Sequence, residues 1–166
     1  MKLWDFALDF YGREGVAPLC LEWQDRAGVD VNVLIYAVWL ACRTGSDVTE
    51  QSVAEADANA SEWRDAIVRP LRAVRRHLKT NPGLAGKDEA DSLRNRVKAL
   101  ELAAECIELE ALERAAPEVT HAFDTAPADR IKRTMELVLL HYDPDAPQDL
   151  LMLATDLPAL GRRFQG

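Results

Sequence analysis

The sequence predicts an all-α protein, a single compact helical domain over residues 1–166 with six or seven helices around a buried central helix. Helix-favouring residues dominate, and alternating runs of β-branched residues are scarce. The length of 166 residues is enough for one self-sufficient core. Apolar residues make up 48% of the chain and charged residues 29%, a balance typical of globular proteins rather than disordered ones.

The stretch from residue 20 to residue 42 places the centre of this domain. A helix over residues 16–27 ends at Gly28, since glycine readily adopts the left-handed conformation that closes helices. Asp30 then caps a helix that runs to Arg43, because its carboxylate accepts hydrogen bonds from the first turn. That helix is apolar on nearly all sides and, at about 12 apolar residues, too short to span a bilayer. We therefore expect a core helix covered by its neighbours, and no membrane partner.

The remaining helices are expected around this centre, over residues 3–11, 50–60, 61–79 and 91–115, with two more beginning near residues 125 and 145. Asp47 and Glu50 have the spacing of a capping box at the start of the 50–60 helix. Pro70 predicts a kink, or a break a few residues upstream, because proline lacks the N–H that a helix interior needs. Residues 84–89 are expected to form a mobile loop.

Charge and cysteine content limit the classes of function. The net charge of −8 argues against a general nucleic-acid binder. Cys20, Cys42 and Cys106 are odd in number and form no C-x-x-C pair, which predicts reduced thiols and a cytoplasmic location. The N-terminus carries Asp5 and Asp9 where a signal peptide would be apolar.

One helix face is basic. Five cations of the 61–79 helix fall within about one third of its circumference, namely Arg69, Arg72, Arg75, Arg76 and Lys79. Such a face suits an acidic protein partner or, with less support because few aromatic residues interleave, a nucleic acid. Alternatively, glutamates of residues 101–113 on the next helix neutralise these arginines internally. The first interpretation predicts a non-catalytic cytoplasmic interaction or regulatory protein.

A second hypothesis concerns polar residues beside the central helix. Gln24 and Asn32 would line a small pocket with Trp23 and Tyr36 as its walls, which predicts a small-molecule-binding protein or an enzyme. The alternative is structural, because the same amides can satisfy backbone groups at the turn between two helices. A third hypothesis is self-association through an apolar patch on the C-terminal helices, which would make the protein a homo-oligomer.

No motif indicates catalysis, a cofactor or a metal. His77, His121 and His141 are far apart and belong to no ligand set of known spacing. The chain contains no G-x-S-x-G, Walker or G-x-G-x-x-G sequence. We therefore predict no catalytic residues, no cofactor and no metal, and favour a protein that is not an enzyme.

Several segments resemble a family of small uncharacterised proteobacterial proteins with the signature C-L-x-L-Q-(D/N)-x-x-G-x-D-V-N-L-L-L. These segments are LWDFAL at residues 3–8, CLEWQD at 20–25, GVDVN at 28–32, WR at 63–64 and PLRAVRRHLK at 70–79. Trp23, Val33 and Ile35 replace leucines of that signature and keep the positions apolar. The similarity covers about the first 110 residues. It implies a bacterial cytoplasmic setting and supplies no mechanism.

Overall fold

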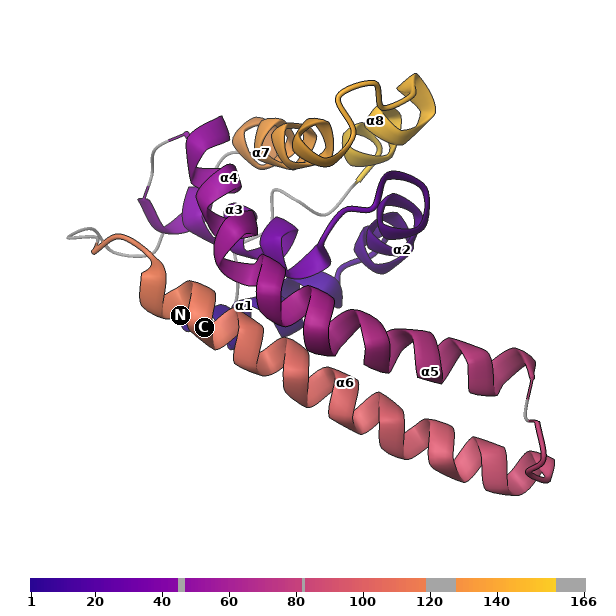
Figure 1. Cartoon of the computed structure of the whole chain (residues 1–166). Helices are drawn as coiled ribbons and strands as arrows, with labels where there is room; N and C mark the ends of the chain where they lie inside the picture. Colours follow the sequence, from indigo (N-terminus) through magenta and orange to yellow (C-terminus); the bar gives the residue numbers. More distant parts are fainter. Residues whose placement is uncertain (45–46, 82, 119–127, 158–166) are drawn as a thin grey trace.

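The structure is a computed structural model, and it describes residues 1–44, 47–81, 83–118 and 128–157. Its helices are α1 (Leu3–Tyr11), α2 (Val16–Ala27), α3 (Val31–Thr44), α4 (Glu50–Trp63), the π-helical turn η1 (Arg64–Val68), α5 (Arg69–Thr80), α6 (Lys87–Ala115), α7 (Ala128–Tyr142) and α8 (Gln148–Thr155). The segments α4, η1 and α5 follow one another directly, so the described residues form seven continuous helical stretches and no strand. The predicted all-α class is confirmed (Figure 1).

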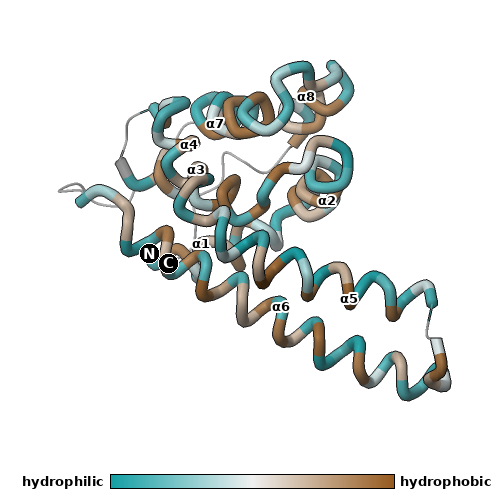
Figure 2. Tube along the Cα trace, viewed as in Figure 1, coloured by the Kyte–Doolittle hydropathy of each residue, from teal (hydrophilic) through white to brown (hydrophobic). Residues whose placement is uncertain are grey.

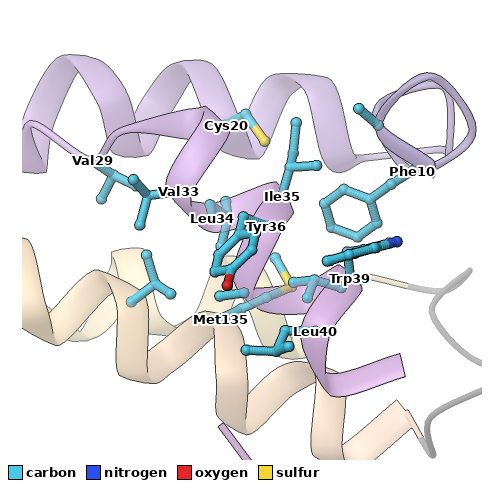
Figure 3. Packing of buried hydrophobic residues seen from close by; sticks show 14 of the residues in the cluster. Phe10, Cys20, Val29, Val33, Leu34, Ile35, Tyr36, Trp39, Leu40 and Met135 are labelled. Atoms are coloured by element: carbon cyan, nitrogen blue, oxygen red, sulfur yellow. The ribbon is translucent and has the colours of Figure 1, made fainter. Parts of the chain in front are cut away.

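The helix α3 lies at the centre, in contact with α1, α4, α6 and α7. Its side chains from Val33 to Cys42 are all buried, as its uniformly apolar sequence predicts. Figure 3 shows these side chains between Phe10 and Cys20 on one side and Met135 of α7 on the other. Asp30 caps the helix as predicted, since its Oδ1 accepts hydrogen bonds from the N–H groups of Asn32 at 2.8 Å and Val33 at 3.3 Å.

The helix from α4 to α5 continues without a break, but it departs from regular α-helical geometry a few residues upstream of Pro70, where the sequence predicts a kink or a break. The π-helical turn η1 ends two residues before the proline, which stands in the first turn of α5. A proline ring crowds the carbonyl four residues earlier, and a π turn relieves that contact by widening the helix. The predicted cap of α4 is wrong. Thr49 caps it instead, with its Oγ1 accepting from Ser52 N at 3.2 Å, whereas Asp47 lies 3.5 Å from Arg130 of α7.

The helices α5 and α6 form an antiparallel arm that extends from the rest of the molecule (Figure 1). No residue of α5 itself is buried, and polar and apolar positions alternate along both helices (Figure 2). The helix α6 begins at Lys87, four residues earlier than predicted. The loop expected over residues 84–89 is therefore too long, because the Glu89 carboxylate accepts from Gly86 N at 3.2 Å and closes a first helical turn there.

The helices α7 and α8 complete the core. Ile131, Met135 and Val138 of α7 are fully buried, at the positions that the helical spacing predicts. The helix α8 is fastened to α2 by the Trp23 indole, whose Nε1 donates to the Leu150 carbonyl at 3.0 Å. The predicted helix start at residues 125–127 lies outside the described residues. None of the helices that the structure describes is both long and apolar enough to cross a membrane.

Candidate ligand-binding cleft

A cleft of about 490 Å³ opens between α1, the turn from α2 to α3, and the arm formed by α5 and α6. Its apolar walls come from all of these elements and include Trp4, Ala7, Leu8, Leu21, Val29, Ile35, Val68, Leu102 and Leu109. Its polar lining comes mainly from the start of α3, from η1 and α5, and from the middle of α6. The cleft thus combines a broad apolar surface with a concentrated set of charged groups.

Asp30, on the α3 side of the cleft, accepts hydrogen bonds at both of its carboxylate oxygens. Its Oδ1 caps α3, and its Oδ2 accepts from the Arg64 guanidinium at 3.2 Å. Arg64, also buried, bonds further to Asp57 and to the Tyr142 hydroxyl. Burial alone would lower the pKa of Arg64, but the hydrogen bond to Asp57 and the charge of Asp30 outweigh it and raise that pKa. This part of the cleft is a closed ionic network.

A second ionic group joins α5 to α6. Arg72 donates from Nε to Glu101 at 3.0 Å and from Nη2 to Glu105 at 2.7 Å, and Arg75 also bonds to Glu101. Burial raises the pKa of the Glu101 carboxyl, but the hydrogen bonds from Arg75 and Arg72 outweigh burial and lower it. At Glu105 burial prevails over the attraction of Arg72, so the pKa of that carboxyl is raised.

Glu108 differs from all of these carboxyl groups. Only 2% of the residue is exposed, yet neither side-chain oxygen has a hydrogen bond of ordinary geometry to any described group. Burial and the negative charge of Asp30 raise the pKa of Glu108 to about 8, although hydrogen bonding to the Asn32 side chain and the Arg64 charge offset part of that increase. The carboxyl is therefore mainly protonated at neutral pH, and it lines the cleft with Asn32 as its neighbouring hydrogen-bonding group.

The basic face predicted from the sequence is largely neutralised within the protein. Arg72 and Arg75 bond to Glu101, Arg76 lies 2.5 Å from Asp25 of α2, and Arg69 lies 2.7 Å from Asp65. Lys79 is exposed near the end of α5. The four arginines all line the cleft, so these side chains surround a cavity rather than form an open basic surface.

The structure divides the four residues of the predicted pocket. Gln24 and Asn32 line the cleft, whereas Trp23 is fully buried in the core. Tyr36 lines a separate cavity of about 240 Å³ between α3, α4 and the end of α6. The aromatic walls are formed instead by Trp4 and Tyr11 of α1. The helix α1 was not expected beside this turn, because only the tertiary fold brings it there.

Sequence reasoning missed Arg64 and Glu108. A signal for Glu108 exists, because Glu101 and Glu108 are seven residues apart and share a side of α6 with Val97 and Ala104, which are buried. Charged residues on the buried side of a helix are rare unless they are paired. Arg64 carried no comparable signal, since its buried partner Asp30 precedes α3 and lies 34 residues away along the chain.

The polar groups of the cleft can form hydrogen bonds and ion pairs. Among the described residues, no group of three or more His, Cys, Asp or Glu side chains could hold a metal ion. Burial raises the pKa of the Cys20 thiol to about 12, so this thiol is not a nucleophile at neutral pH. A protonated Glu108 can donate one hydrogen bond, and an ionised Glu108 can accept several or pair with a cation.

Comparison with known proteins supports the extent of the resemblance seen in the sequence. One family model matches residues 2–112, a range that contains every residue lining the cleft. No curated protein and no solved structure matches the chain. Since the matched range is more than half of the 166 residues, the chain belongs to the DUF2390 family, which is described as a protein of unknown function.

Proposed function

We propose that this protein binds a small molecule in the cleft between α1, α3 and the arm of α5 and α6. The observation that carries the proposal is Glu108, a buried carboxyl group on the cleft wall whose two oxygens lack a hydrogen bond of ordinary geometry. Leaving a buried polar group unsatisfied costs about 1–3 kcal/mol, and native proteins avoid it unless another requirement is served. A ligand that bonds to Glu108 offsets that cost and provides such a requirement.

The surroundings of Glu108 support the same proposal. Binding sites for small molecules are concave, mostly apolar and roughly 300–1,000 Å³ in volume, with a few polar groups that fix the ligand. The cleft, at about 490 Å³, meets that description. Asn32 adds an amide group beside Glu108, and Gln24 adds another elsewhere in the cleft lining, so a ligand would meet hydrogen-bonding groups from several elements.

An acidic protein partner for the basic face has less support. Arg72 and Arg75 already neutralise buried carboxylates, and a partner would have to compete with those contacts. Only Arg69, Arg76 and Lys79 present exposed charge, and two of these are paired with Asp65 and Asp25. A nucleic-acid partner faces the same difficulty. From the family resemblance alone, we further propose that the protein acts in the bacterial cytoplasm.

A fragment screen by NMR on isotope-labelled protein tests the binding proposal. We expect the backbone amides that respond to cluster at residues 28–35 of the turn and α3 and at residues 98–109 of α6. Asn32→Ala should weaken the fragments that bind by about 5-fold or more, because it removes an amide within the cleft. Asn95→Ala is the matched control, since Asn95 is exposed on α6 and does not line the cleft.

Two results would contradict the proposal. One is a screen in which no fragment shifts the cleft amides. The other is a set of fragments that bind equally to the wild type, Asn32→Ala and Asn95→Ala, because such fragments bind elsewhere.

A further inference from the structure

We infer that the ligand of the cleft carries a protonated nitrogen that pairs with Glu108 and an apolar body, and that its binding displaces the proton from Glu108. This inference rests on the proposed function and gives the chemical class of the ligand. It is drawn from the charges that face Glu108, from the shape of the cleft and from the unoccupied positions of the carboxyl group.

The charges inside the cleft are not balanced. Its least exposed charged groups are four carboxyl groups, from Asp30, Glu101, Glu105 and Glu108, and three guanidinium groups, from Arg64, Arg72 and Arg75. The exposed side chains of Asp25, Arg69, Arg76 and Lys98 also line the cleft. Each arginine is bonded to a carboxylate other than Glu108. Arg64 is also shared with Asp57 and Asp65. Among these least exposed groups the carboxyls outnumber the guanidiniums by one, and a bound proton on Glu108 balances the charge when no cation is present.

The groups that face Glu108 favour a cation over an anion. They are Asp30 and Asn32 at the start of α3, Arg64 of η1 and Glu105 of α6. Arg64 is itself bonded to Asp57 of α4, and Glu105 to Arg72 of α5. An anion placed at Glu108 would meet Asp30 and Glu105 with no arginine free to pair with it. A protonated amine would replace the missing charge and bond to both oxygens of Glu108.

The remaining surface of the cleft selects an apolar body. Trp4, Leu8 and Leu102 lie along its walls, and Leu8 and Leu102 are about half exposed in the absence of a ligand. Covering such side chains gains roughly 25 cal/mol per Å² of apolar area. An amine with a hydrocarbon chain or ring therefore fits both parts of the site, with its nitrogen at Glu108 and its carbon atoms against these walls.

Binding of a cation must be linked to protonation. A protonated Glu108 is neutral and gains little from an ammonium group, whereas the ionised carboxylate pairs with it directly. The affinity for an amine should rise about tenfold for each pH unit from about pH 6 to about pH 8, where Glu108 loses its own proton in the free protein. The amine remains protonated over this range, as a lysine side chain does.

Three probes of one size test the inference, namely n-hexylamine, n-hexanol and hexanoate. Their affinities are measured by NMR titration on the whole chain at several pH values between about 6 and 8.5. We expect n-hexylamine to bind best at high pH with the tenfold slope, n-hexanol to bind weakly without a slope, and hexanoate to bind least. In Glu108→Gln, hexylamine should lose both its preference over hexanol and its pH slope. Glu110→Gln is the matched control, because Glu110 is exposed on the same helix.

The outcomes separate the inference from the function on which it rests. If hexanol or hexanoate binds in the cleft at least as well as hexylamine, or if hexylamine keeps its pH slope in Glu108→Gln, the cationic ligand is overturned while a binding cleft remains. If none of the probes and no other fragment perturbs the cleft amides, the proposed function itself fails.

Discussion

Asp30 at the start of α3 and Glu108 in α6 both provide buried carboxyl groups to the same cleft. The two carboxyl groups differ in their hydrogen bonding. Asp30 accepts two backbone hydrogen bonds and one from Arg64, while neither oxygen of Glu108 has a hydrogen bond of ordinary geometry. The first group contributes to folding by capping a helix and anchoring an arginine. The second costs stability as it stands. The contrast assigns one carboxyl group to the scaffold and leaves the other for the binding role proposed above.

Removing the partner of Asp30 should have the largest effect on this comparison. We expect Arg64→Ala to lower the free energy of unfolding by about 3–5 kcal/mol, because it leaves Asp30 buried and unpaired. Urea denaturation measures this change. Arg69→Ala is the control, since its pair with Asp65 is exposed and worth about 1 kcal/mol or less. Equal effects of the two substitutions would contradict the scaffold role of Asp30.

The pH dependence of stability tests the protonation state of Glu108, the second carboxyl group of this comparison. The pKa of Glu108 is about 8 in the folded protein, against about 4.3 for an unfolded glutamate. The folded state therefore binds more protons between these values, and its stability falls as the pH rises from about 5 to 8. We expect this fall to be about 2–4 kcal/mol smaller in Glu108→Gln.

The measurement is the free energy of unfolding of both proteins, determined by denaturation at several pH values without ligand. Glu110→Gln should retain the wild-type slope, because the Glu110 carboxyl is exposed. A slope in Glu108→Gln as steep as that of the wild type would show that Glu108 is ionised in the folded protein at neutral pH.

A third prediction compares two arginines of the former basic face. Arg72→Ala should cost about 2–3 kcal/mol in unfolding free energy, because it removes partners from Glu101 and Glu105 in the cleft wall. Arg76→Ala should cost less than about 1 kcal/mol, since Arg76 and Asp25 are both half exposed. Thermal denaturation of the two variants decides the matter. Similarly small losses of unfolding free energy in both variants would instead support the hypothesis that this face is available to an acidic partner.

The smallest effect is expected at the cap of α4. Thr49→Ala should lower stability by about 1 kcal/mol, because the hydroxyl caps only one backbone N–H. Asp47→Ala, the cap predicted from the sequence, should change stability by less, since Asp47 is exposed at the surface. Asp30 both caps a helix and pairs with an arginine, whereas Thr49 only caps a helix. The loss in Thr49→Ala therefore shows how much stability a helix cap alone contributes. A larger loss in Asp47→Ala than in Thr49→Ala would reverse this assignment.

The fold and the site were predictable to different extents because they depend on different distances along the chain. The Asp30 cap and the Gly28 turn involve neighbours within a few residues, and local spacing predicts them. The pairing of Arg64 with Asp30 spans 34 residues, and the isolation of Glu108 depends on several helices at once. No local pattern contains that information. Sequence spacing still placed Gln24 and Asn32 at the cleft, because the α2–α3 turn is a local structure.

The close packing of α7 against α3 has a practical consequence for anyone working with a shortened chain. Family similarity ends at residue 112, but Ile131, Met135 and Val138 cover one side of α3 completely. In a fragment that ends at residue 112, this side of α3 would be exposed to water as a hydrophobic surface, which favours aggregation. The segment that matches the family is therefore shorter than the segment expected to fold on its own.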